Sequence, residues 1–151
     1  MDDHYWMQQA LLQAKKALEV DEVPIGAILV QDNQFIAGSY NQPISTHDPS
    51  AHAEICCLRQ AGQKLNNYRF PGTTMYVTLE PCAMCAGALI QARISRLVFA
   101  AYEPRSGAVE SVFQILNNTK LNHRIEVFSG ALQEQSAQML QDFFRQKRKK
   151  V

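Results

Sequence analysis

Segments patterned as β-strands alternate along this chain with segments patterned as α-helices, and this alternation limits the fold more than any other feature. Apolar, β-branched or aromatic runs of strand length lie at 26–30, 35–37, 73–79, 97–101 and 125–128. Helical spacing or helix-start signals mark helices expected at about 5–20, 50–61, 81–92, 111–116 and 132–144. Because such an alternation buries a sheet beneath helices, the sequence predicts an α/β domain.

The second of these helices has sequence signals at both ends. Asp48 suits an N-cap and Pro49 suits a first turn, so we expect the helix to begin near residue 50. Gly62 is expected to end it. The preceding segment, 41–50, is expected to be a loop because it contains two prolines and several polar residues.

The other connections carry signals of their own. Asp32 and Asn33 predict a two-residue hairpin turn between the first two strands. Residues 103–107 are expected to form a loop before the short helix at 111–116. Because no repeat, low-complexity segment or linker divides the chain, residues 1–151 are expected to form a single domain.

The composition is that of a globular protein, since 46% of the 151 residues are hydrophobic and 19% are charged. The cysteines Cys56, Cys57, Cys82 and Cys85 lie in close pairs, which favours metal or redox chemistry over disulfides. No apolar run has membrane-spanning length, and the polar start at 1–4 does not resemble a secretory signal. We therefore expect a cytoplasmic protein with no membrane partner.

Basic residues gather at the C-terminal end of the chain. Residues 145–150 hold five of the 15 Lys and Arg, so the rest of the chain has 10 against 14 Asp and Glu, a net charge of −4. This asymmetry suggests an anionic partner such as nucleic acid, although a solvated basic tail is the plainer interpretation. If RNA binds, we expect phosphate contacts from Lys147, Arg148, Lys149 and Lys150.

Two short segments carry the residues that point to chemistry: His52-Ala53-Glu54 and Pro81-Cys82-Ala83-Met84-Cys85. His52, Cys82 and Cys85 offer one nitrogen and two sulfur ligands. Three protein ligands leave the fourth position of a tetrahedral zinc site for water, which is the catalytic pattern. Both segments lie at expected helix N-termini, whose partial positive charge favours thiolates.

Glu54, two residues after His52, has a different expected role. A carboxylate close to zinc can take a proton from the attacking water and deliver it to a ring nitrogen. The Cys-x-x-Cys pair alone would also fit a redox pair or half of a structural zinc site, but the two segments together have the order typical of zinc-dependent nucleobase deaminases. Cys56 could reach the metal from one helical turn away, yet small core residues are the expected role of Cys56 and Cys57.

Longer matching stretches cover nearly the whole chain. They are Glu22-Val23-Pro24-Ile25-Gly26-Ala27, Tyr40-Asn41-Gln42-Pro43, residues 47–54 and 76–88, Asn122-His123-Arg124 and Asp142-Phe143-Phe144-Arg145. With these segments the chain resembles the bacterial tRNA-specific adenosine deaminases of the cytidine deaminase-like superfamily. The resemblance implies a three-layer α/β/α sandwich around a five-stranded mixed sheet. It also implies a homodimer and the hydrolysis of adenosine to inosine at the wobble position of a tRNA anticodon.

The same resemblance implies roles for individual residues. It implies one zinc ion per subunit, bound by His52, Cys82 and Cys85, with Glu54 as the proton shuttle. It implies that the substrate, a tRNA anticodon stem-loop, is held by Asn41, Ala53, Glu103, Phe144 and Arg145. The family usually has Asp where Glu103 stands, so the contacts with nucleotides beside the target are expected to differ here.

Aromatic side chains could stack on the bases of an exposed RNA loop, and Tyr102, Phe143 and Phe144 are the candidates. Because two adjacent residues cannot share one helix face, at least one of the two phenylalanines is expected to pack in the core instead.

Two other functions fit parts of the sequence. A deaminase of a free base such as guanine or cytosine would share the zinc ligands and Glu54, but it would give no reason for the basic C-terminal residues. A catalytically inert, zinc-stabilised RNA-binding module would not need Glu54, so the presence of this residue counts against it.

Overall fold

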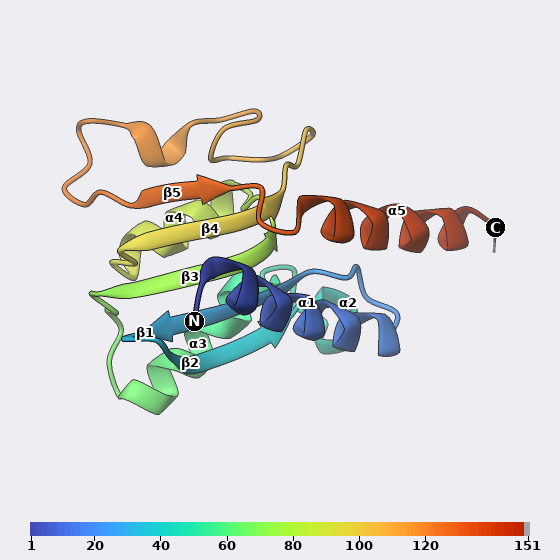
Figure 1. Cartoon of the computed structure of the whole chain (residues 1–151), viewed down its shortest axis with the longest axis horizontal. Helices are drawn as coiled ribbons and strands as arrows, with labels where there is room; N and C mark the ends of the chain where they lie inside the picture. The colour runs from blue at the N-terminus through green and yellow to red at the C-terminus, as the bar shows by residue number, and fades with distance from the viewer. Residues whose placement is uncertain (150–151) are drawn as a thin grey trace.

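The computed structural model describes residues 1–149 and has a sheet at its centre (Figure 1). The five strands lie in the order β2-β1-β3-β4-β5. They are β1 (Gly26–Gln31), β2 (Gln34–Tyr40), β3 (Thr73–Leu79), β4 (Arg96–Ala101) and β5 (Glu126–Ser129). The sheet is mixed, because β1 is antiparallel to β2 and β3 while β3, β4 and β5 run parallel.

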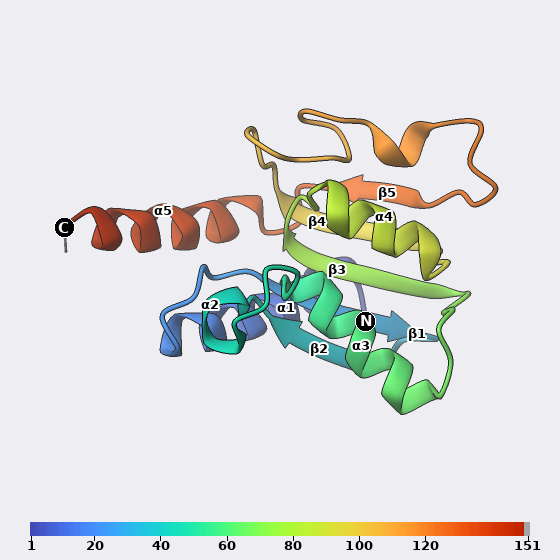
Figure 2. The same cartoon turned by 180° about the vertical axis from the view of Figure 1, so that it is seen from behind.

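Helices cover both faces of this sheet. On one face lie α1 (Asp3–Glu19) and α5 (Gln133–Lys149), and on the other lie α3 (Ala53–Leu65) and α4 (Ala83–Gln91) (Figures 1 and 2). Successive strand residues point to opposite faces, so Ile28 packs in the core beside α1 and Leu29 packs in the core beside α3 and α4. The expected three-layer α/β/α sandwich with a five-stranded mixed sheet is confirmed.

The hairpin between β1 and β2 has the expected two-residue turn. Asp32 and Asn33 have φ values of 52° and 60°, as a type I′ turn requires, and Gln31 pairs with Gln34 across it. This prediction is confirmed.

The second long helix, α3, differs from its prediction at both ends. It begins at Ala53, with His52 as the N-cap, and not near residue 50. The Asp48 carboxylate does not cap it, because that carboxylate accepts hydrogen bonds from the backbone N–H and the hydroxyl of Ser50, at 2.9 and 2.7 Å. Gly62 does not end the helix, which continues to Leu65 and stops at the left-handed Asn66.

The segment expected to be a loop, 41–50, contains the one-turn helix α2 (Pro43–Thr46). The buried carboxylate of Glu22 stabilises it by accepting the backbone N–H groups of Ile44 and Ser45, at 3.3 and 2.6 Å, and the hydroxyl of Ser45. The sequence prediction missed α2 because this partner lies on a different part of the chain.

The prediction of a short helix at 111–116 is wrong. Only a 3₁₀ turn, Ile115–Asn117, forms in this region. The backbone N–H groups of Val112 and Phe113 both donate to the carbonyl of Gly107, and the N–H of Ser111 donates to the side chain of Glu80. These hydrogen bonds replace the bonds from each N–H to the carbonyl four residues earlier that an α-helix would need.

The basic C-terminal residues 145–149 are helical, because α5 continues to Lys149; Lys150 lies outside the described residues. The end of α5 projects beyond the rest of the molecule (Figure 1). Within residues 1–149, no helix is long and apolar enough to cross a membrane.

Candidate active site

Two helix N-termini meet at one edge of the sheet. β2 and β3 both end at this edge, because each is antiparallel to β1. The loop after β2 leads to His52, the N-cap of α3, and the turn after β3 leads to Cys82, the N-cap of α4. Cys85 follows in the first turn of α4. The fold therefore brings His52 to two cysteines that lie 30 and 33 positions further along the chain.

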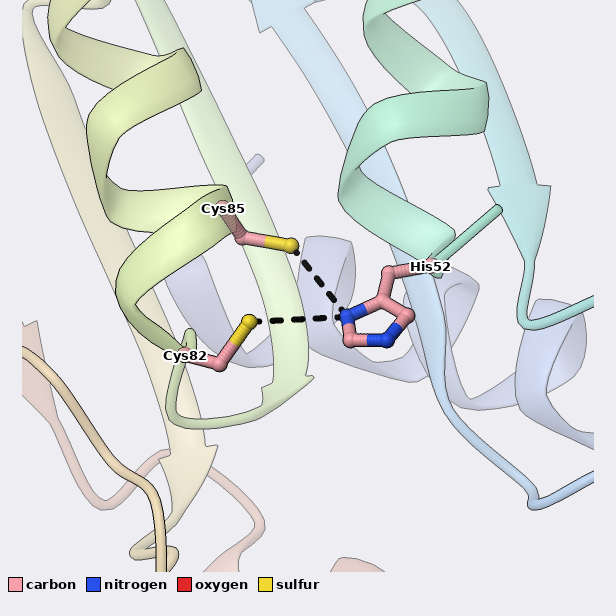
Figure 3. Close-up of side chains that lie close together, drawn as sticks. All are labelled: His52, Cys82 and Cys85. Atoms are coloured by element: carbon pink, nitrogen blue, oxygen red, sulfur yellow. Dashed lines mark hydrogen bonds between the residues drawn. The ribbon is translucent and has the colours of Figure 1, made fainter. Parts of the chain in front are cut away.

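These three side chains form one group of possible metal ligands (Figure 3). The Nδ1 atom of His52 lies 3.5 Å from the Sγ atom of Cys82 and 3.5 Å from that of Cys85. All three ligand atoms lie within 4.8 Å of one another. One imidazole nitrogen and two sulfurs at this spacing could hold a metal ion.

Hydrogen bonds within the group give the two thiols different acidities. The bond from Cys85, with a second from His52, lowers the pKa of Cys82 to about 4 although burial opposes this. The bond to Cys82, together with burial, raises the pKa of Cys85. The bond to Cys82 also raises the pKa of His52. The free protein thus already favours one thiolate, at a helix N-terminus.

Glu54 lies beside this group in the first turn of α3. Its side chain is buried, and burial raises its pKa to about 7, although a backbone hydrogen bond and nearby His52 oppose the shift. A carboxyl group with such a pKa can both accept and donate a proton near neutral pH.

The other two cysteines are not part of the ligand group. Cys57 is fully buried in the core, and its Sγ atom lies 3.5 Å from the carbonyl oxygen of Ala37. Cys56, the residue before it in α3, is half-buried. Burial raises the pKa of both thiols, as expected for residues that pack and do not react.

A cavity of about 700 Å³ lies between α5 and the loop after β4. The loop contributes Tyr102, Glu103, Pro104 and Arg105, and α5 contributes Phe144, Arg145 and Arg148. Apolar residues complete the lining, among them Val23, Ile25, Leu79 and Ala101. The fold thus brings three of the expected substrate residues, Glu103, Phe144 and Arg145, to one cavity.

The other two expected substrate residues, Asn41 and Ala53, do not line that cavity. Ala53 is fully buried between His52 and Glu54, and Asn41 is 6% exposed. The backbone N–H of Asn41 donates to the carbonyl of Ile25, which does line the cavity. Both residues therefore lie within the body of the protein.

The aromatic and acidic residues of the cavity differ partly from expectation. Neither phenylalanine belongs to the core, because the end of α5 extends past the sheet: Phe143 is half-buried and Phe144 is 45% exposed. The expectation that one of them packs in the core is wrong. The carboxylate of Glu103 accepts the backbone N–H of Arg105 at 2.9 Å, so it already has a partner within its own loop.

The sequence analysis missed Glu80, whose buried carboxylate lies directly before the Pro81-Cys82 turn. Burial opposes its ionisation, but hydrogen bonds from Ser111 and from backbone N–H groups outweigh burial and lower its pKa. The available signal was a charged residue between a buried strand and the turn that carries a candidate metal ligand. Arg105 in the cavity was also missed.

Comparison with known proteins finds similar chains and a matching family model. Residues 1–148 match the model of the MafB19-like deaminase family. A curated relative, the tRNA-specific adenosine deaminase of Haemophilus influenzae, is 46% identical over 147 residues, which cover 97% of this chain and 85% of the relative.

Two solved structures have a similar fold. One comes from a study of A-to-I editing by tRNA:A34 deaminases at the wobble position of tRNA; it is 46% identical, with a TM-score of 0.87, and the match covers 90% of this chain and 99% of that one. The other is guanine deaminase from Bacillus subtilis, which is 32% identical, with a TM-score of 0.65, over 68% of this chain and 66% of that one.

Proposed function

Because this chain belongs to the MafB19-like deaminases and, within them, to the tRNA-specific adenosine deaminases, we propose that it hydrolyses adenosine to inosine at the wobble position of a tRNA anticodon. The observation that carries the proposal is the His52, Cys82 and Cys85 ligand group with the buried carboxyl of Glu54 beside it. The reaction consumes one water and releases ammonia.

The ligand group suits one zinc ion per subunit. Two cysteine sulfurs and one imidazole nitrogen are ligands that zinc prefers, and a set of three protein ligands is typical of catalytic sites. When bound, zinc supplies a Lewis acid that lowers the pKa of water to near neutrality.

Glu54 moves the protons of the reaction. Its carboxylate takes a proton from the attacking water and delivers it to N1 of the adenine ring as oxygen attacks C6. It then assists the departure of the amino group as ammonia. A pKa raised by burial towards neutrality suits both directions of transfer.

The residues around the ligand group and the cavity accept an RNA base that has left its stack. The target nucleotide must leave its stack to reach the ligand group, which costs least in a loop that already exposes its bases. We propose that Asn41 and Ala53 contact the target, while Glu103, Phe144 and Arg145 contact its neighbours from the 700 Å³ cavity. The exposed ring of Phe144 offers a stacking surface.

The end of α5 contributes positive charge at this cavity, through Arg148, and next to it. Lys147, Arg148 and Lys149 lie in its last turn, and we propose that they, with Lys150, contact phosphates of the anticodon stem-loop. The proposal includes a homodimer, as the family resemblance implies, and a cytoplasmic site of action, as a tRNA substrate implies.

Deamination of a free base is the second candidate, because guanine deaminase from Bacillus subtilis has a similar fold at 32% identity. The arginines and the exposed aromatic ring around the 700 Å³ cavity favour RNA over a free base. Glu54 beside the ligand group argues against an inert RNA-binding module.

The test is incubation of the zinc-loaded protein with a stem-loop that carries adenosine at the wobble position, with inosine detected by mass. The Glu54→Ala variant is the comparison, and Glu110→Ala, at an exposed glutamate, is the control. We expect inosine from the native protein and the control, and none from Glu54→Ala. Turnover of free guanine or cytosine without inosine in the stem-loop would overturn the proposal.

A further inference from the structure

The loop between β4 and the 3₁₀ turn is held in place by one side chain from outside it. The carboxylate of Glu80, at the end of β3, accepts hydrogen bonds from four backbone N–H groups and one hydroxyl of this loop. The donors are the N–H groups of Glu103 (3.1 Å), Val109 (3.1 Å), Glu110 (2.8 Å) and Ser111 (2.9 Å), and the hydroxyl of Ser111 (2.5 Å). Glu80 is 2% exposed, so water does not replace these bonds.

Both oxygens of the carboxylate are used. Oε1 accepts from the N–H of Glu103 and the hydroxyl of Ser111, whereas Oε2 accepts from the three consecutive N–H groups that begin at Val109. An amide side chain has only one acceptor oxygen, and its NH₂ group would face donors. Glutamine therefore cannot reproduce the arrangement in either orientation.

The same loop is tied to the candidate metal site. The backbone N–H of Ala108 donates to the carbonyl of Pro81 at 2.8 Å, one residue before Cys82. Glu80 itself donates its backbone N–H to Ala101, at the end of β4. Gly107 packs so closely that a Cβ atom there would collide with the Glu80 carboxylate.

We propose that Glu80 is a positioning residue for the substrate pocket. It fixes the loop that carries Glu103 and Arg105 relative to the turn that carries Cys82. The distance between the cavity that would hold the neighbouring nucleotides and the ligand group therefore stays constant. This inference rests on the proposed function, because it assigns the loop to RNA binding. Glu80 is buried and does not line the 700 Å³ cavity, so it acts through the loop.

The position of this loop explains why a fixed spacing matters. Its residues Tyr102, Glu103, Pro104 and Arg105 form one wall of the 700 Å³ cavity, and α5 forms the facing wall. A loop released from Glu80 would have to be ordered again by each incoming RNA. The cost would appear as weaker binding, while the ligand group and Glu54 would stay in place.

The test compares Glu80→Gln with Glu110→Gln, an equal change of charge at an exposed residue of the same loop. For Glu80→Gln we expect a KM for the anticodon stem-loop raised about 10- to 100-fold. We expect kcat to change far less and one zinc ion per chain to be retained. Hydrogen exchange should quicken at residues 109–111. Glu110→Gln should match the native protein in all these measurements.

Two further variants apply if Glu80→Gln does not fold. Ser111→Ala removes one of the five bonds, and Gly107→Ala pushes the loop away while leaving Glu80 intact. Both should raise KM in the same direction, Ser111→Ala least. An unchanged KM in these variants, or a fall in kcat with loss of zinc at constant KM, would overturn the proposal. If the native protein produced no inosine, the proposed function would fail instead, whereas the exchange at 109–111 would still report on the loop.

Discussion

Lys147, in the last turn of α5, forms an ion pair with Asp21, which follows α1, with its Nζ atom 2.6 Å from Oδ2. The Nζ atom also lies 5.6 Å from the centre of the Phe143 ring. The pair is exposed on both sides, so it contributes only about 0–1 kcal/mol to stability. Lys147, a proposed RNA contact, is thus already paired with a carboxylate of the same chain, and an RNA phosphate can replace that carboxylate.

We expect Asp21→Asn to increase affinity for the anticodon stem-loop, because Lys147 no longer has to leave a carboxylate. The gain should be about two- to fivefold at low salt and should shrink as salt rises. Fluorescence anisotropy over a salt series measures it. Glu19→Gln makes the same charge change at an exposed position near the end of α1. An equal gain in both variants would show general electrostatics and contradict a specific competition.

Cysteine replacements separate the ligand group from its neighbours. Cys82→Ser should lose most bound zinc because the site keeps only two of its three ligands. Cys56→Ser should retain one zinc per chain, because Cys56 lies outside the group of ligand atoms. Metal analysis of the dialysed proteins provides the measurement. A loss of zinc in Cys56→Ser comparable to that in Cys82→Ser would make Cys56 a ligand.

The strands and long helices could be predicted because local patterns decide them. The strand that contains Ile28 and Leu29 is a continuous apolar run buried on both faces, and the turn at Asp32 and Asn33 has its own residue preference. That His52 and Cys82 act together could be predicted as well, because their two segments have the order typical of zinc-dependent deaminases and each lies at an expected helix N-terminus.

What could not be predicted depends on side chains that bind backbone far away in the sequence. Glu22 holds α2 and Glu80 holds residues 103–111, and neither partnership leaves a periodic pattern. Asp48 shows the reverse case. Its residue type and position suit a helix N-cap, but its carboxylate accepts hydrogen bonds from the nearer N–H and hydroxyl of Ser50 instead. Local propensity therefore failed to predict the structure of the loops next to the ligand group, 41–50 and 103–111.

The pair Asp3 and Arg96 links the start of α1 to β4 and should make stability depend on pH. Arg96 donates to both carboxylate oxygens of Asp3, at 2.8 and 2.5 Å, and this bonding lowers the pKa of Asp3 below its ordinary 3.8, although burial opposes it. The Asp3 carboxylate also accepts the hydroxyl of Tyr76, whose pKa burial and this bond raise to about 12.

Since the folded pKa of Asp3 is depressed, its contribution is present above pH 3.8 and is lost as pH falls through the folded pKa. Asp3→Asn should therefore cost about 1 kcal/mol at neutral pH, a value reduced because the pair is partly exposed. The difference from the native protein should shrink below pH 3.8. Urea unfolding at several pH values measures this. Asp32→Asn, in the exposed hairpin turn, makes the same substitution away from Arg96 and is the control.

Two glycines provide a matched test of packing between α1 and the sheet. Gly26, the first residue of β1, lies so close to α1 that an added Cβ would collide with the carbonyl oxygen of Ala10 and the N–H of Ala14. Helix backbone cannot move aside without shifting α1 as a whole. Gly26→Ala should therefore lower the free energy of unfolding by about 3 kcal/mol or more.

Gly87, inside α4, is the opposite case, because a Cβ there meets nothing within 4 Å. Gly87→Ala should raise the free energy of unfolding by about 0.5–1 kcal/mol, since alanine loses less backbone freedom on entering a helix. Urea denaturation of the two variants beside the native protein measures both changes. Opposite signs are expected from the same chemical substitution. A small loss at Gly26 would show that α1 can move away from β1 at little cost, and would contradict tight packing of this helix against the face of the sheet.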